Sequence, residues 1–146
     1  MRYTTLFVIV LIGSYLFSCS GSKPPTNFVV KDGKYNFFFF DTANSKKCDG
    51  NLTLENAYPN KIFGKYNVVN RNQDTIPGFN YNKGYYEGTT TDKGNTIFLN
   101  MNPKIADANL FVNANVVGDS IVGTWNFSTL KGIQDRGIFK AGLIRE

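Results

Sequence analysis

The sequence predicts an all-β fold, an eight-stranded antiparallel up-and-down barrel. Apolar residues at the 3.6 spacing of a helix are absent after residue 26, whereas alternation with a period of two recurs along the chain. Glycine, asparagine, threonine and aromatic residues are plentiful, as turns and strands require. An even number of short strands with local connections favours a barrel, because closure removes exposed sheet edges. A two-sheet β-sandwich and an open sheet are the alternatives.

The clearest strand covers residues 110–116, where every second residue from Leu110 to Val116 is apolar and asparagines lie on the opposite face. The same alternation, with Gly, Asn, Asp and Pro marking the connections, predicts the other strands. The expected strands are 33–41, 50–57, 61–70, 83–91, 95–101, 109–117, 120–128 and 136–143.

A glycine followed two residues later by an aromatic residue recurs along the chain. At period two both residues point to the same face, which suits a closing barrel, because the strand can bend at glycine while the ring fills the interior. The uneven spacing of the copies indicates an echo between hairpins and not a solenoid repeat. The copies are Gly33-Lys34-Tyr35, Gly64-Lys65-Tyr66, Gly84-Tyr85-Tyr86, Gly123-Thr124-Trp125 and Gly137-Ile138-Phe139.

The phase of the strands predicts which side chains point into the barrel. An eight-stranded barrel is only wide enough to be filled or to hold one small ligand, and the many large inward residues favour a filled interior. The phenylalanine run 37–40 must bury rings on both faces or expose some outside, where they would mark a partner or membrane contact. The expected inward residues are Tyr35, Leu52, Leu54, Ile62, Tyr66, Val68, Tyr86, Ile97, Leu99, Leu110, Val112, Val116, Ile121, Trp125, Phe127 and Phe139.

The first segment has the composition of a secretory signal. One positive charge, Arg2, precedes an uncharged apolar run that is too short to span a membrane as a stable anchor. The run ends in Leu16-Phe17-Ser18-Cys19, which resembles the lipobox of bacterial lipoproteins, although Phe17 is bulkier than the usual residue at its place. The resemblance implies cleavage before Cys19, a diacylglyceryl group on its thiol and acylation of the new amine. An ordinary signal peptide with a chance cysteine is the alternative.

The expected organisation is a lipoprotein signal peptide at 1–18, a lipidated flexible tether at 19–27 and one β-barrel domain at 28–146. The segment Ser20-Gly21-Ser22-Lys23-Pro24-Pro25 has the composition of a linker, and two or three acyl chains on one residue anchor a protein stably. By analogy with enteric lipoproteins, Ser20 after the cysteine favours the outer membrane of a Gram-negative bacterium. Cys48 is then the remaining thiol, and we expect it to be buried as a small hydrophobic side chain.

The formal net charge of +5 includes Arg2, which leaves with the signal peptide. The remaining lysines and arginines are scattered along the chain, whereas a nucleic-acid-binding protein needs a basic patch or stripe. We therefore expect no nucleic-acid partner. A surface that tolerates anionic lipid or polysaccharide fits the charge better.

The tripeptide Gly118-Asp119-Ser120 resembles the start of the GDSL esterase signature. A serine nucleophile needs a base, which is a histidine in that family, and this chain contains no histidine. The tripeptide also lies between two alternating segments, and a Gly-Asp pair can supply the positive φ angles of a two-residue hairpin turn. We interpret it as a turn.

Other catalytic or cofactor sites are not indicated. The lack of histidine removes most zinc sites and any imidazole proton shuttle. Glu55, Glu87 and Asp92 lie on or beside predicted strands without a catalytic motif, so we expect them to be solvated. The segment 41–49 has neither the acidic spacing nor the closing glutamate of a calcium loop, and no phosphate-binding loop is present. We expect no enzyme activity, no metal and no cofactor.

The connections predict where a ligand would bind. In an up-and-down barrel alternate connections share one end, so the long loops 42–49, 71–82, 102–108 and 129–135 would form one rim and the tight turns the other. The first strand starts at the tight-turn end, so the lipid anchor would leave the long-loop rim facing away from the bilayer. The expected contacts to a ligand or partner are Lys46, Lys47, Arg71, Asn72, Phe79, Tyr81, Lys104, Lys131 and Arg136. Phe79 and Tyr81 are large rings in a loop, which either bind a partner or fold back to plug the barrel.

This architecture is similar to that of lipocalin-like and avidin-like barrels, which bind small ligands or inhibit proteases. The similarity includes Gly-x-Trp at Gly123 and Trp125, but a lipocalin carries this motif on its first strand, so ligand residues cannot be transferred. The function expected is a non-catalytic, membrane-anchored binding module that uses its rim for a small molecule, glycan or protein. The alternative is a structural or assembly lipoprotein with a packed interior, serving an envelope complex.

Overall fold

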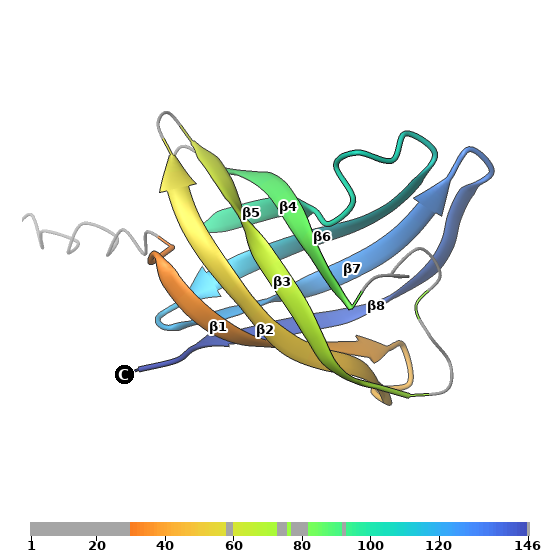
Figure 1. Ribbon diagram of the computed structural model, residues 1–146, viewed down its shortest axis with the longest axis horizontal. Helices are drawn as coiled ribbons and strands as arrows, with labels where there is room; N and C mark the ends of the chain where they lie inside the picture. Colours follow the sequence, from red (N-terminus) through yellow and green to blue (C-terminus); the bar gives the residue numbers. More distant parts are fainter. Residues whose placement is uncertain (1–29, 58–59, 73–75, 77–81, 92, 146) are drawn as a thin grey trace, which may run out of the picture.

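The computed structural model describes residues 30–57, 60–72, 76, 82–91 and 93–145. These residues form a closed barrel of eight antiparallel strands in sequence order, with the last strand paired to the first (Figure 1). The predicted barrel is confirmed, and the sandwich and the open sheet are excluded. The strands are β1 (Gly33–Asp41), β2 (Lys46–Ala57), β3 (Lys61–Arg71), β4 (Lys83–Thr90), β5 (Thr96–Asn100), β6 (Ala108–Val117), β7 (Ser120–Thr129) and β8 (Gly132–Leu143).

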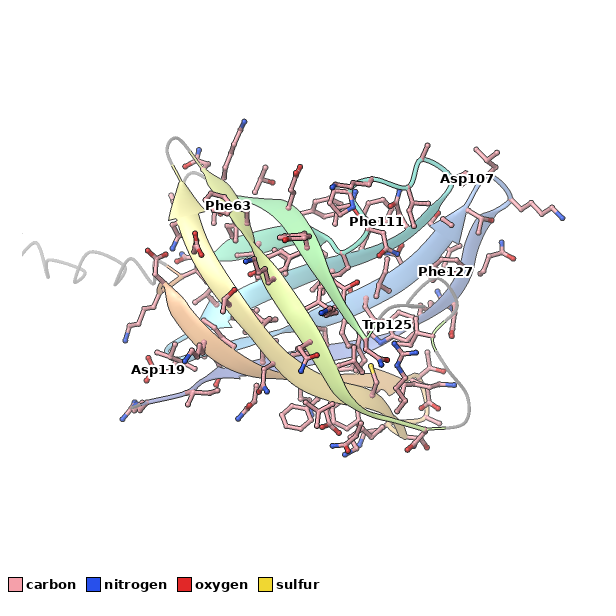
Figure 2. All side chains as sticks on the ribbon, viewed as in Figure 1. Phe63, Asp107, Phe111, Asp119, Trp125 and Phe127 are labelled. Carbon is pink, nitrogen blue, oxygen red and sulfur yellow. The ribbon has the colours of Figure 1, made fainter. Side chains whose placement is uncertain are left out.

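The connections define two ends of the barrel. The proximal end carries the turns 58–60, 91–95 and 118–119 together with the start of β1, and the distal rim carries the connections 42–45, 72–82, 101–107 and 130–131. Asp119 lies at the proximal end and Asp107 at the distal rim, on opposite sides of the molecule (Figure 2). The predicted separation of the connections between the two ends is therefore confirmed.

The expectation that all four distal connections are long was wrong. Residues 46–49 belong to β2 and residues 132–135 belong to β8, so the first and fourth connections are tight. The charged residues of both segments were assigned to loops, yet Lys46 and Asp49 form an ion pair of 2.6 Å while the intervening Cys48 is buried. The connections 72–82 and 101–107 are the longer ones at this rim.

The barrel interior is packed with apolar side chains. All the residues predicted to point inward are buried, and Phe37, Phe39, Cys48, Ala114 and Ala141 join them. The ring of Phe39 packs edge-on against Trp125 at 5.8 Å and against Phe139 at 5.1 Å between ring centroids. Such contacts fill the space that a ligand would need, as expected for an eight-stranded barrel.

The glycine–aromatic copies pair with each other across two hairpins. In β3 and β4, Gly64 lies opposite Tyr86 and Tyr66 lies opposite Gly84. In β7 and β8, Trp125 lies opposite Gly137, and Gly123 lies opposite the aromatic residue of the fifth copy. A Cβ atom on Gly84 would lie 2.4 Å from the Tyr66 hydroxyl oxygen, so this glycine leaves room for the ring of the facing strand, as Gly64 and Gly137 also do.

The phenylalanine run alternates between the two faces of β1. Phe37 and Phe39 are fully buried, whereas Phe38 is 37% exposed and Phe40 is partly exposed on the outer face. The outer rings stack at 6.4 Å between centroids, and Lys140 lies 5.1 Å from the ring of Phe40. The outer half of the run is therefore a small apolar patch.

The Gly118-Asp119-Ser120 segment is the expected hairpin turn. Val117 pairs with Ser120, which leaves Gly118 and Asp119 as the loop between β6 and β7. Only the glycine has a positive φ, of 61°, so the turn resembles type II′, in which the first loop residue alone needs glycine.

Candidate functional site

The distal rim holds the predicted binding residues that the structure describes. Lys46 and Lys47 lie in β2, Arg71 ends β3, and Asn72 follows it; Lys104 lies in the β5–β6 connection, Lys131 in the β7–β8 turn and Arg136 in β8. Phe79, Tyr81 and the predicted lipidation residue Cys19 lie outside the described residues. These residues share one end of the barrel, but Lys104 and Arg136 line different hollows.

Lys104 contributes to a groove that continues from the distal rim over the outside of β3, β4 and β5. Hollows of 220, 580 and 530 Å³ lie side by side here and share lining residues. We call them together the outer groove, and its shared residues are Phe63, Tyr85, Glu87, Pro103 and Lys104. The two larger hollows have the size of small-molecule sites.

The outer groove exists because β5 is short. Four of its five residues, 97–100, pair with Glu87–Thr90 of β4 and leave Lys83–Tyr86 paired only with β3. The β5–β6 connection then passes beside Gly84 and Tyr85 and forms the wall of the hollow of 220 Å³. The difference in length between β4 and β5 thus leaves a depression in the outer surface of the barrel at this position.

Aromatic side chains line the outer groove. Tyr85 is 60% exposed and Phe63 is 42% exposed, and the Lys65 ammonium group lies 5.6 Å from the centroid of the Tyr85 ring. Figure 2 shows Phe63 on the outside of the barrel, as its strand phase requires. Glu55 and Glu87 flank Phe63 in the cross-strand register. These outward aromatic residues were not among the binding residues predicted from the sequence, although their alternation with buried neighbours could have identified them.

Arg136 lies in a different hollow. A volume of 400 Å³ beside the β7–β8 hairpin is lined by Thr42, Trp125, Ile133 and Arg136 among others. Lys131 lies at the tip of the same hairpin, next to the largely exposed Leu130. Neither residue lines the outer groove, so the rim predicted as one binding mouth is divided.

A β-bulge determines the direction of Arg71. Gly50 pairs with Val68 and Asp49 pairs with Asn70, so Val69 is the extra residue of β3 and is 57% exposed. Beyond the bulge the alternation is shifted by one residue, and Arg71 pairs with the buried, inward Cys48. The bulge therefore turns Arg71 toward the barrel mouth, as bulges do at functional sites.

Two donor nitrogen atoms of Arg71 have no acceptor among the residues that the structure describes. Its Nε and Nη2 atoms are buried and form no hydrogen bond, while the residue as a whole keeps part of its surface exposed. The backbone beside it is fixed, because the Asn72 amide donates to the Lys47 carbonyl at 2.9 Å and the Asn72 side-chain amide donates to the Lys46 carbonyl. A buried unpaired donor in a native fold needs an explanation, such as a bound ion or ligand.

Two acids of the rim, Asp41 and Asp49, are already engaged. The Asp41 carboxylate accepts from the backbone amides of Ala43 and Ser45 at 2.9 and 2.8 Å. Partial burial would raise the pKa of Asp49, but hydrogen bonds from Lys46 and Asn70 lower it below its ordinary value. Among the described residues of the rim, Lys46 is the only cation paired with a carboxylate. The remaining cations give the rim a positive character.

Cys48 is a free, buried cysteine of the barrel. Burial raises the pKa of Cys48 to about 12, although the nearby positive charge of Arg71 opposes the shift, so the thiol stays protonated near neutral pH. No cluster of metal-ligating side chains occurs within the described ranges. No helix among the described residues is long and apolar enough to cross a membrane.

Comparison with protein-family models and with curated proteins gives no match for this chain.

Proposed function

We propose that this protein is a non-catalytic binding module of the bacterial cell envelope, anchored by lipid on Cys19. The proposal of an anchor is supported by the apolar leader that ends in Leu16-Phe17-Ser18-Cys19 and by the linker that follows. Anchoring in the outer membrane follows from Ser20 by analogy. Because β1 starts at the proximal end, a tether entering there leaves the distal rim free for a ligand.

The outer groove is the observation that carries the proposal of a binding module. The interior is packed with apolar side chains, so we place the ligand on the outside, where two hollows of small-molecule size meet at Phe63, Glu87 and Pro103. Exposed rings supply apolar contact, and Lys104 supplies charge beside them. The distal rim and the outer groove together form the proposed binding face.

The anchor is tested by metabolic labelling with radioactive palmitate in the host. The unmodified chain should carry label and remain in the membrane fraction, because the acyl chains hold it there. Cys19→Ser should lose both label and membrane retention, whereas Cys48→Ser, the matched control, should keep them. Equal labelling of the Cys19→Ser variant would refute lipidation at this residue.

The binding face is tested by native mass spectrometry of the protein purified from its host. A small molecule retained by the unmodified protein should be lost or reduced in Lys104→Glu, which reverses a charge in the outer groove. Lys93→Glu makes the same charge change at the proximal end and should retain the molecule. Equal loss in both variants, or retention in both, would contradict the proposed face.

A structural or assembly lipoprotein is the second candidate function. The packed interior and the outer patch of Phe38 and Phe40 support it, because a solid barrel with exposed stacked rings can contact an envelope partner. Phe98 and Phe111 form a second stacked pair on the outside, at 5.4 Å between centroids. Loss of a co-purifying protein in Phe38→Ser, with the retained small molecule absent from all variants, would favour this second function.

A further inference from the structure

We propose that Arg71 binds an oxyanion group, a carboxylate or a phosphate, of the ligand held at the distal rim. This inference rests on the proposed function and names the chemistry that the binding face selects. It starts from the two unpaired donors of Arg71 and from the bulge that directs them to the barrel mouth.

The two unpaired atoms form one recognition edge. Nε and Nη2 lie on the same side of the planar guanidinium group, and their N–H bonds are parallel. This arrangement matches the two oxygens of a carboxylate or a phosphate, which accept two charge-assisted hydrogen bonds at once. An ammonium group, which is a point charge, cannot reproduce the geometry.

A second arginine of the same chain uses this edge on a carboxylate. At the proximal end, Nε of Arg145 donates to Asp119 Oδ2 at 3.0 Å, and Nη2 of Arg145 donates to the same oxygen. The exposed Arg145 thus has an acceptor, whereas the partly buried Arg71 has none. A role confined to folding would predict the opposite distribution, because unpaired donors are more costly when buried.

The scaffold around Arg71 is built to hold it in place. The β-bulge at Val69 sets its direction, and both hydrogen bonds of Asn72 tie the end of β3 to β2. Its cross-strand neighbour is the buried Cys48, and the Asp49 carboxylate next to that residue is paired with Lys46. The other rim cations would attract an anion and steer it to this edge.

The test is a titration of the protein, purified from its host with its native N-terminus and labelled with 15N-arginine. Sodium acetate and inorganic phosphate are the two probes, added at constant ionic strength against sodium chloride. The barrel domain contains Arg71, Arg136 and Arg145, so the Nε–Hε spectrum holds few signals. The Arg71 signal should shift and saturate, and the probe that saturates at lower concentration identifies a carboxylate or a phosphate ligand.

Two charge-conserving variants distinguish paired hydrogen bonds of the guanidinium group from simple electrostatic attraction. Arg71→Lys should weaken binding of the preferred anion roughly 10- to 100-fold, because it keeps the charge and loses the paired donors. Arg145→Lys, at the proximal end and outside the proposed binding face, is the matched control and should bind as the unmodified protein does. An unsaturable Arg71 signal, or equal affinity in Arg71→Lys and the unmodified protein, would overturn the inference.

Thermal unfolding in an anion-free zwitterionic buffer distinguishes a loss of folding from a loss of anion binding. Arg71→Met should unfold at the same or a higher temperature than the unmodified protein, because it removes an unpaired buried charge, and it should lose the stabilisation by the preferred anion. A lower unfolding temperature for Arg71→Met would show that the guanidinium has an acceptor within the chain and would overturn the inference. If native mass spectrometry instead finds a neutral ligand that Lys104→Glu releases, this inference fails while the proposed function stands.

Discussion

At the scale of single residues, Asp119 shows how the turn once compared with an esterase serves the fold. Its carboxylate accepts from the Lys31 ammonium group at 2.8 Å and from the guanidinium of Arg145. Its backbone carbonyl accepts from the Leu143 amide at 2.8 Å. The turn between β6 and β7 therefore contacts both the segment before β1 and the segment at the end of β8.

These contacts predict a pH-dependent contribution to stability. The hydrogen bonds from Lys31 and then Arg145 lower the pKa of Asp119, so its stabilising effect is present above the unfolded value of about 3.9 and is lost as the pH falls through the folded pKa. Asp119→Asn should therefore lower the free energy of unfolding at pH 7 and have little effect at an acidic pH well below the folded pKa. Urea unfolding at both pH values measures the difference, which salt should reduce.

Asp107→Asn provides the control for this prediction. Asp107 is an exposed carboxylate at the opposite end of the barrel, where it is not part of the Asp119 contacts (Figure 2). Its substitution should change the free energy of unfolding by the same small amount at both pH values. A loss in Asp119→Asn that persists unchanged in acid would show that the backbone turn, and not the carboxylate charge, is responsible.

At the scale of the strands, the pairing of glycine with an aromatic residue explains why the motif recurs. Trp125 Nε1 donates to the Phe40 carbonyl at 2.7 Å, across the strand that carries Gly137. A Cβ atom at Gly137 would lie 1.9 Å from that carbonyl oxygen and 2.7 Å from Trp125 Nε1. The glycine thus permits both the close strand approach and the buried hydrogen bond.

Gly137→Ala should accordingly destabilise the barrel by roughly 1–3 kcal/mol or more, because the backbone carbonyl cannot move away from the added methyl group. Thermal and urea unfolding followed by Trp125 fluorescence measure the loss. Gly142→Ala is the control in the same strand, since a Cβ atom there meets nothing within 4 Å. If both substitutions had equal effects, the steric explanation of the motif would be wrong.

The distal end of β8 extends past its neighbouring strand β1 and is protected there by its own side chains. Residues 132–136 of β8 extend beyond β1, and a bulge at Gln134 interrupts them. The Arg136 amide donates to the Asp135 carboxylate at 2.8 Å, and the Gln134 side chain donates to the Gly132 carbonyl at 3.1 Å. This edge is therefore occupied by its own side chains, which discourages pairing with another chain.

The strands were predictable from the sequence because one face of each is buried, which imposes strict alternation. The extensions of β2 and β8 were not, since Lys46 and Asp135 are charged and indicated loops. The bulge at Val69 was not predictable either, because one extra residue leaves no mark in the composition, yet it decides the direction of Arg71. The rim membership of Arg71 could be predicted, but its unpaired donors required coordinates.

At the scale of the whole molecule, the barrel is closed and its interior is packed with apolar side chains, so the proposed binding face lies outside it. The pattern of inward residues foretold the packed core, because period-two phase alone determines which side chains share the interior. The outer groove could not be foretold, since it depends on the difference in length between β4 and β5 and on the path of the β5–β6 connection. Local pattern thus predicted the scaffold, whereas non-local register produced the candidate site.

The clasp at Asp119 has a topological consequence. Lys31 and Arg145 meet on one carboxylate, and the Ile144 amide donates to the Lys34 carbonyl at 2.8 Å, so β8 and β1 resemble a hairpin that lacks only its covalent link. Because β8 and β1 are held together in this way, the chain could begin and end at another turn of the barrel without changing the sheet. A circularly permuted gene, joined at this clasp and opened at Lys131, would encode the same sheet with its termini transferred to the distal rim.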